Sequence, residues 1–254
     1  MRGLVTAFRT LTIFPIPGKD AEDFAAALPY FPAVGAVLGL LAVAIAAAFT
    51  WLGWAGGAGV VVTVALLLCT RGLHLDGLAD AADAVGGGRT RERRLEIMKD
   101  PHVGSFGAAA IGADLLIKAS CLGRVASAHA WAWLIVAMTV SRTCMVLMAV
   151  TLPYARATGG TAAPFVRNAS LRHLLYAVAA AGALCLILLG PSGLALLAIG
   201  AATALALRPG MRRAFGGITG DLLGTTNEVV ECVLFILLGL FAPDLPKLGW
   251  ALLF

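Results

Sequence analysis

The chain has 254 residues, 60% of them hydrophobic and 13% charged, with a mean hydropathy of +0.91 and a formal net charge of +5. Soluble domains average about 45–50% apolar and about 25% charged residues, so this composition excludes a water-soluble globule and a disordered chain. It predicts an all-α, polytopic integral membrane helix bundle, whose basic residues lie in short loops where membrane topology explains them better than nucleic-acid binding.

Apolar runs of bilayer length predict about seven transmembrane spans in a single membrane-embedded domain over 1–254. No continuous apolar signal-peptide segment precedes the first run, so we expect the spans themselves to direct insertion. The five cysteines lie in or beside the runs without a C-x-x-C pair, so we expect buried thiols and no disulfides. The runs, of which the sixth is short, cover 30–51, 59–83, 103–122, 130–152, 171–189, 194–207 and 228–241.

The second run carries three carboxylates, which are costly inside a bilayer and usually mark a functional site. Asp76, Asp80 and Asp83 recur at i, i+4 and i+7, so they share one helical face within roughly 60°. Their mutual repulsion requires a neutralising partner, and Mg²⁺ is suited because it prefers oxygen ligands and keeps waters for a substrate phosphate. Small residues between the acids, such as Gly77, allow a neighbouring helix or a bulky ligand to approach. The alternative is a solvated helix end, which suits Asp83 best because a glycine-rich loop follows it.

Two histidines and a lysine near these acids are further candidates. His74 lies on the opposite side of the same helix and is either a packing residue or a ligand. Lys99 and His102 flank Pro101 in a loop with two glycines, where they are placed to meet an anion. The alternative for this loop is an ordinary capped junction between a loop and a helix.

Polar residues also interrupt the third and fourth runs. An i,i+4 ion pair is the simple interpretation of Asp114 and Lys118. Arg142 either binds a phosphate or pairs with an acid on another helix, and the sequence leaves both open. Arg156 follows the fourth run and is placed at the mouth of the bundle.

A second acidic cluster lies at the start of the last run. Asp221 and Glu228 lie on one helical stripe, and Glu231 extends it deeper into the span. The glycine-rich approach at 216–220 is suited to bring backbone N–H groups to a phosphate at a helix start. Alternatively, Thr219 and Asp221 are ordinary helix caps.

Lysines and arginines are distributed unevenly between alternate connections. Fourteen lie before the first run or in the connections after the second, fourth and sixth runs, whereas Arg124 and Lys247 lie on the other side. The positive-inside rule therefore predicts that the N-terminus and the fourteen cations are cytoplasmic. Both acidic clusters then lie toward the cytoplasm.

Two kinds of chemistry fit acids and cations gathered at one side of a membrane bundle. One is metal-assisted phosphoryl transfer, in which Mg²⁺ bridges a diphosphate and Arg or Lys neutralises developing charge. The other is cation-coupled transport, in which intramembrane acids bind the ion. Because the acids lie at one side and not at the bilayer midplane, the pattern favours the enzyme.

Several blocks of the sequence resemble the adenosylcobinamide-GDP ribazoletransferase family, also called cobalamin synthases or cobalamin-5′-phosphate synthases. The most specific are G-L-H-L-D-G-L-A-D-A-A-D at 72–83, K-D-P-H-V-G-S-F-G at 99–107 and G-I-T-G-D-L-L-G at 217–224. Matching segments at 7–17, 30–35, 141–142 and 153–156 keep the family's order over nearly the whole chain. The sequence departs from the family pattern at two positions, where Arg71 replaces Gly and Ala81 replaces Thr. Neither departure removes a candidate metal ligand, but Arg71 puts in doubt how that helix end packs.

The resemblance implies the final assembly of the cobalamin nucleotide loop in a prokaryotic cytoplasmic membrane. The substrates are adenosylcobinamide-GDP and α-ribazole or its 5′-phosphate, the leaving group is GMP, and Mg²⁺ is the cofactor. The active site faces the cytoplasm. A homo-oligomer or an association with other enzymes of the pathway stays open.

The resemblance also implies roles for the candidate residues. Asp76 and Asp80 are the primary Mg²⁺ ligands, and His74 or one of the acids is the base for the ribose hydroxyl. The carboxylates expected to complete the metal site are Asp83, Asp221 and Glu228. The residues expected to contact the substrate are Lys99, His102, Arg142, Arg156 and Glu231.

The nearest alternative is a membrane phosphotransferase of the CDP-alcohol class, which also builds a Mg²⁺ site from Asp-Gly blocks. Its D-x-x-D-G-x-x-A-R order is absent here, because Leu73 and Ala81 stand where that motif needs Asp and Arg. A cation-coupled transporter is the third interpretation.

Overall fold

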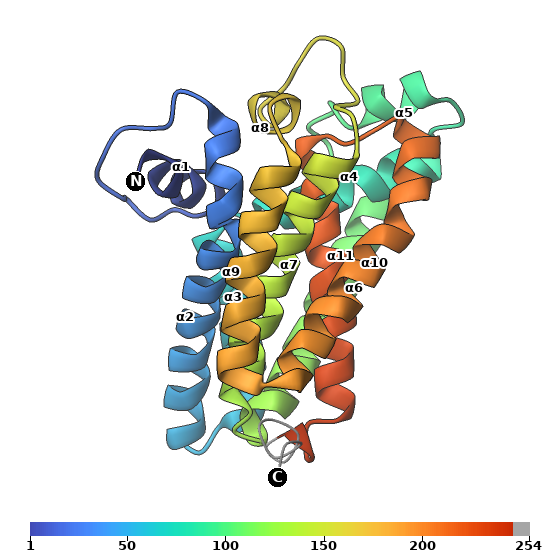
Figure 1. Cartoon of the computed structure of the whole chain (residues 1–254). Coiled ribbons are helices and arrows are strands. Elements are labelled where there is room, and N and C mark those ends of the chain that lie inside the picture. The colour runs from blue at the N-terminus through green and yellow to red at the C-terminus, as the bar shows by residue number, and fades with distance from the viewer. Residues whose placement is uncertain (246–254) are drawn as a thin grey trace.

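The computed structural model describes residues 1–245, and Figure 1 shows this part of the chain as a bundle of long helices. Within these residues, six helical segments are long and apolar enough to cross a membrane, or up to seven if a bent pair forms one span. The predicted all-α bundle with about seven spans is therefore confirmed. The long helices are α2 (Phe31–Trp51), α6 (Ser105–Ser127), α7 (Trp131–Thr151), α9 (Leu171–Leu189), α10 (Pro191–Phe215) and α11 (Gly220–Leu240), and the bent pair is α3 (Ala55–Cys69) with α4 (Leu73–Gly87).

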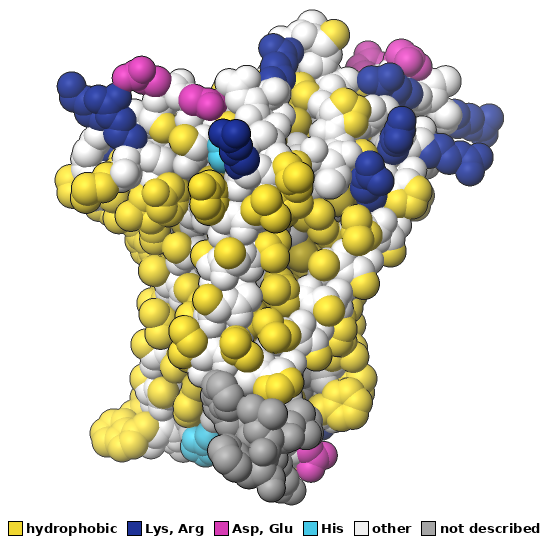
Figure 2. Space-filling model, in the orientation of Figure 1, with side chains coloured by type: hydrophobic (Ala, Val, Ile, Leu, Met, Phe, Trp, Pro, Cys, Tyr) yellow, Lys and Arg dark blue, Asp and Glu magenta, His cyan; other side chains and the backbone are white. Residues whose placement is uncertain are grey.

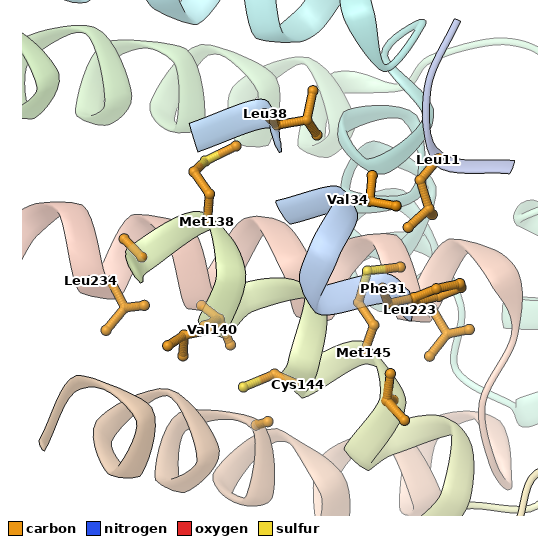
Figure 3. Packing of buried hydrophobic residues seen from close by; sticks show 14 of the residues in the cluster. Leu11, Phe31, Val34, Leu38, Met138, Val140, Cys144, Met145, Leu223 and Leu234 are labelled. Carbon is orange, nitrogen blue, oxygen red and sulfur yellow. The ribbon is translucent and has the colours of Figure 1, made fainter. Parts of the chain in front are cut away.

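Helices α7 and α11 form the centre of the bundle. Of the residues in the apolar, membrane-spanning part of each helix, 78% are buried in α7 and 72% in α11. The corresponding share is 17% in α9 and 22% in α10. Helix α7 is covered on most sides because it packs against α2, α9, α10 and α11. Figure 3 shows part of this core, where α7 meets its neighbours through Val34, Leu38, Met138, Val140 and Leu234.

The outer surface divides into an apolar belt and a charged end. Figure 2 shows hydrophobic side chains around the middle of the molecule and nearly all visible Lys and Arg side chains at one end. Large apolar residues such as Leu40, Leu175 and Ile187 are exposed on this belt, as expected of side chains that face lipid. The gathering of cations predicted from the connections is therefore present in the fold, although Lys247 lies outside the described residues.

Short helices cover the charged end, and they are α1 (Arg2–Leu11), the 3₁₀ helix η1 (Phe24–Tyr30), α5 (Arg91–Ile97) and α8 (Ala163–Arg167). Helix α1 is amphipathic, lies across the end of the bundle in Figure 1, and buries Val5, Phe8 and Leu11. An ion pair of 2.9 Å between Arg9 and Asp20 ties the following loop back to α1. The charged end therefore has a folded cap.

The predicted second span is wrong as a continuous helix, because it breaks between α3 and α4. Arg71 and Gly72 have φ angles of 55° and 66°, in the left-handed region that a right-handed helix cannot include. The two helices meet at 90°, so α4 turns sharply away from the direction of α3. This bend carries the three predicted carboxylates to the charged end of the molecule.

The predicted limits of the last two spans also need correction. The sixth is not short, because α10 continues over 25 residues through Pro209 and the arginines near its end. Those arginines are good helix formers and lie at the charged end, where an apolar pattern no longer marks the helix. The last span begins at Gly220 and not at 228, because the hydroxyl of Thr219 caps it by accepting from the backbone N–H of Leu222 at 3.2 Å.

Candidate active site

The two acidic clusters meet where α4 crosses α11. A Cβ atom on Gly77 would collide with the backbone of Asp221, and one on Gly224 would lie 2.9 Å from the Cα of His74. The hydroxyl of Thr225 donates to the carbonyl of Gly77 at 2.9 Å. Glycine at 77 and 224 thus lets the two backbones touch, as predicted for the small residues of this helix. The contact places Asp76 and Asp80 of α4 beside Asp221 of α11.

Arg156 joins this acidic group from a separate segment. The backbone N–H of Ala155 donates to the carbonyl of Ile218, and that of Ile218 donates to the carbonyl of Pro153, both at 2.9 Å. This bridge holds the chain after α7 against the start of α11. The guanidinium of Arg156 then donates to the Asp221 carboxylate at 2.9 Å and to the carbonyl of Met98 at 3.3 Å.

The site carries more negative than positive charge. Asp80 is half-buried and lies within electrostatic range of Asp76, Asp83, Asp221 and Arg156. Four carboxylates that face one guanidinium repel one another in a partly dehydrated site, so a divalent cation would stabilise them.

The available oxygens fit such a cation. Within residues 1–245 the carboxylates of Asp76 and Asp80 make no ion pair or hydrogen bond, so both are available as ligands. Within the described chain, no three acidic, His or Cys side chains lie close enough together to hold a metal ion by themselves. Mg²⁺ keeps several of its waters and needs only one or two protein carboxylates together with substrate phosphates. The open set of Asp76, Asp80 and Asp221 is therefore suited to an ion that arrives with a phosphorylated substrate.

Asp83 has a different position from the other two acids of α4. Its carboxylate accepts the backbone N–H groups of Gly104 at 2.7 Å and of Gly107 at 2.8 Å. It therefore caps the start of α6 and satisfies donors that the helix leaves free. The structure thus uses Asp83 to hold the loop 98–107 against α4.

Lys99 and His102 separate within that loop. Lys99 lines a cavity of about 250 Å³ together with Arg91 and Arg156. His102 is exposed and turns to Asp100, to which its ring lies at 2.7 Å. Hydrogen bonds from the His102 backbone and ring hold the pKa of Asp100 below its ordinary value. Of the two residues, Lys99 is the one that lies beside the acidic site.

Arg91 was not among the predicted site residues. It lies in the basic stretch 89–94, whose charges were assigned to membrane topology alone. In the fold, its guanidinium donates to the carbonyl of Ala155 at 3.0 Å, next to Arg156. No local pattern marks it, because its contact with Ala155 joins segments 64 residues apart in the sequence.

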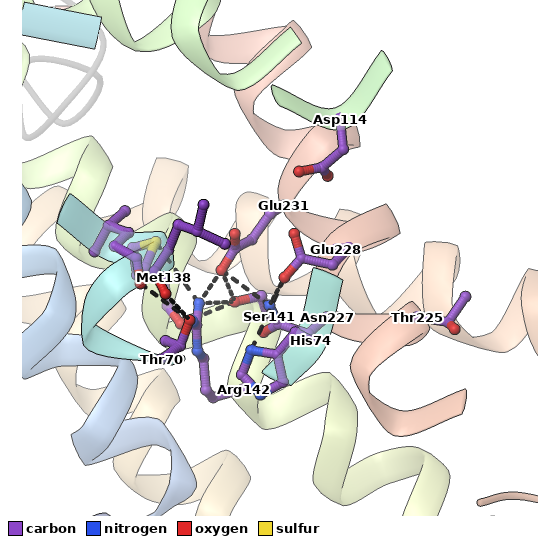
Figure 4. Close-up of polar contacts among 12 residues, drawn as sticks. Thr70, His74, Asp114, Met138, Ser141, Arg142, Thr225, Asn227, Glu228 and Glu231 are labelled. Atoms are coloured by element: carbon purple, nitrogen blue, oxygen red, sulfur yellow. Dashed lines mark hydrogen bonds and ion pairs between the residues drawn. The ribbon is translucent and has the colours of Figure 1, made fainter. Parts of the chain in front are cut away.

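Five other residues singled out from the sequence belong to a buried polar network inside the bundle (Figure 4). Lys118 pairs with Asp114 at 3.3 Å, with Glu231 at 2.9 Å and with Glu228, so the predicted pair of Asp114 and Lys118 is confirmed. Arg142 pairs with Glu231, which is the second of its two predicted alternatives. Glu228 and Glu231 are therefore neutralised by cations of α6 and α7, apart from the open carboxylates of α4.

His74 lies between the network and the acidic site. Its Nδ1 is 3.9 Å from a carboxylate oxygen of Glu228, and its Nε2 is buried and has no partner in the described chain. Figure 4 labels both residues. His74 also lines a cavity of about 220 Å³ together with Asp76 and Asp221. A histidine with one free ring nitrogen in such a cavity can accept a proton from a bound substrate.

Comparison with known proteins agrees with the predicted family. A family model described as cobalamin-5-phosphate synthase matches residues 3–239. The chain is similar to adenosylcobinamide-GDP ribazoletransferase of Chlorobaculum tepidum, 45% identical over 257 residues that cover 99% of each chain. The protein of the same name from Chlorobaculum parvum is 44% identical over 250 residues, which cover 96% of this chain and 98% of the relative. The one from Syntrophobacter fumaroxidans is 40% identical over 234 residues, which cover 90% of this chain and 94% of the relative. No solved structure matches the chain.

Proposed function

This chain belongs to the cobalamin-5-phosphate synthase family, and we propose that it joins adenosylcobinamide-GDP to α-ribazole or α-ribazole 5′-phosphate. The ribazole 3′-hydroxyl attacks the phosphorus attached to the cobinamide arm and forms a new phosphorus–oxygen bond. The bond from that phosphorus to GMP breaks, and the hydroxyl proton passes to a base. The observation that supports this function most directly is the contact between α4 and α11, which sets Asp76, Asp80 and Asp221 beside Arg156.

Asp76, Asp80 and Asp221 are the proposed holders of Mg²⁺. The ion, when bound, would neutralise the diphosphate and polarise the phosphorus that is attacked. Asp221 keeps its orientation through the hydrogen bond from Arg156, and Asp80 is half-buried between its acidic neighbours. Glu228, which the sequence also proposed as a ligand, is supported only as a partner of Lys118 and His74.

Arg91, Lys99 and Arg156 are the proposed diphosphate contacts. They line one cavity of about 250 Å³ next to the carboxylates, so an anion there would lie between cations and a metal. Guanidinium groups bind phosphate oxygens in a fixed geometry, and such charges stabilise the transition state of phosphoryl transfer without reorganisation. These cations would then assist the loss of GMP by neutralising its phosphate.

His74 is the proposed base. The residue lines the cavity that Asp76 and Asp221 also line, and its Nε2 makes no hydrogen bond within the described chain. Glu228 lies near its Nδ1 and favours a fixed orientation of the ring. The cations at the charged end support a cytoplasmic position of the whole site in a prokaryotic membrane, as the positive-inside rule predicts.

An assay of the purified chain in lipid nanodiscs tests this function. The reaction contains adenosylcobinamide-GDP, α-ribazole and Mg²⁺, and chromatography follows GMP and the corrinoid product. We expect equal amounts of GMP and a ribazole-containing corrinoid, with the reaction stopped by EDTA and restored by added Mg²⁺. Folded protein that transfers CDP-alcohols and not ribazole would favour the alternative phosphotransferase.

A further inference from the structure

An apolar cavity opens directly beside the acidic site. It has a volume of about 220 Å³ and lies between α1, α2, α4, α7, α8 and α11. His74, Asp76 and Asp221 form its polar end. Thr10 and Thr161 add two hydroxyl groups, and the rest of the wall is mainly apolar and includes Leu11, Phe31, Leu73, Met145, Phe165 and Leu223.

The size of this cavity limits what it can hold. Pockets for whole small molecules typically measure about 300–1,000 Å³. A cavity of about 220 Å³ therefore takes a planar ring system, and it is too small for a corrin macrocycle. Of the two substrates of the proposed reaction, this leaves the base of α-ribazole and the guanine of the GDP group as candidates.

The chemistry of the wall separates these two rings. Guanine carries hydrogen-bonding groups around its edges, and an apolar wall would leave several of them unpaired at a cost in free energy. The dimethylbenzimidazole of a ribazole nucleoside has one free ring nitrogen, and its other edges present only ring carbons and methyl groups. The aromatic wall is also fixed in place, because Phe165 packs against Phe24 edge to face at 5.3 Å and against Phe31 at 6.2 Å between ring centroids.

The orientation of the cavity agrees with the proposed reaction. A base held among the apolar residues would direct its attached ribose to the polar end. The ribose hydroxyls would then lie near His74 and the carboxylates of Asp76 and Asp221, where the attack takes place. The anion-binding cavity of Arg91 and Lys99 is a separate space, which leaves the two substrates room to approach together.

We propose that this cavity binds the bicyclic aromatic base of ribazole and determines which base the protein accepts; this rests on the proposed function. Ala162 lines the cavity and is buried, so a larger side chain there would fill the space. Ala128 offers a matched control, because it lines a cavity bounded by Gly56, Arg124 and Pro243, at the other end of α6 from the acidic site.

Kinetics and calorimetry of Ala162→Leu and Ala128→Leu in nanodiscs test the proposal. We expect Ala162→Leu to raise the KM for α-ribazole about tenfold or more, since one or two methylenes in an apolar pocket have effects of that size. The KM for adenosylcobinamide-GDP should change less than about twofold, and Ala128→Leu should behave as the unsubstituted chain. Calorimetric titration with α-ribazole alone should show the same loss of affinity.

Substrate analogues with different bases test the selectivity of the apolar wall without any change to the protein. The unsubstituted chain should prefer the α-nucleoside of dimethylbenzimidazole to that of benzimidazole, and both to that of adenine. A rise in the KM for adenosylcobinamide-GDP in Ala162→Leu, or no preference among the bases, would overturn the proposal. If no turnover occurs but Ala162→Leu still weakens the binding of α-ribazole, the proposed function fails and the base pocket stands.

Discussion

Buried charges determine what individual residues do in this protein. Arg142 and Glu231 are both almost completely buried and pair with each other, while Lys118 contacts three acids. Sequence alone leaves Arg142 open between a phosphate and an acid, because the choice depends on which helix lies opposite α7. By contrast, the spacing of Asp114 and Lys118 predicts their pair, since the helix itself brings residues four apart together.

Removal of one partner from the buried network should destabilise the fold. Glu231→Gln leaves Arg142 without its partner and Lys118 with one acid fewer, and breaking a buried pair costs about 3–5 kcal/mol. Unfolding in mixed micelles, followed by circular dichroism, measures this change. The double variant Arg142→Met with Glu231→Met should recover much of the loss. A free energy of unfolding within about 0.5 kcal/mol of the unsubstituted value for Glu231→Gln would contradict the account.

Helix contacts explain how the site is assembled at the next scale. The periodicity of 72–83 predicts a helix with its acids on one face, and the fold has that helix. The left-handed turn is marked in the sequence only by Gly72, because Arg71, which shares this conformation, is of a type that rarely adopts it. The capping role of Asp83 depends on two backbone N–H groups about twenty residues away, which a pattern along one helix cannot contain.

A substitution at the crossing of α4 and α11 should separate the acidic clusters. Gly77→Ala pushes the new methyl group against the backbone of Asp221, so we expect a loss of stability of about 1–3 kcal/mol and at least a tenfold loss of turnover. Gly112→Ala on α6 is the control, because its Cβ would meet no atom within 4 Å. It should be neutral or slightly stabilising. Equal behaviour of the two variants in unfolding and GMP-release assays would exclude a role for the close contact.

The whole molecule is polarised, with a folded, charged end over an apolar belt (Figure 2). Composition and the distribution of cations predict this polarity without any knowledge of packing. They do not predict the cavity beside the acids, which six separate elements enclose. A bundle of this form allows a large amphipathic substrate to approach from the water while its reactive phosphate meets charges at the helix ends.

Labelling with a membrane-impermeant maleimide tests the predicted orientation. Thr158→Cys lies in the connection between α7 and α8 at the charged end, and Leu52→Cys lies in the turn between α2 and α3 at the opposite end. Inside-out vesicles should label Thr158→Cys, and right-side-out vesicles should label Leu52→Cys. The unsubstituted chain measures the background from its native cysteines. The reverse pattern would place the charged end outside the cytoplasm.

The central claim is that the carboxylates joined at the crossing of α4 and α11 carry out the transfer. Single-turnover release of GMP by Asp76→Asn, Asp80→Asn and Asp221→Asn in nanodiscs, over a series of Mg²⁺ concentrations, tests it most directly. Glu22→Gln is the control, because it removes a carboxylate that pairs only with Arg2 on the surface among the described residues. We predict folded variants with about a 100-fold or greater loss of rate and a requirement for more Mg²⁺, and a control that is unchanged. Rates within about twofold of the unsubstituted chain for all three variants would contradict the account.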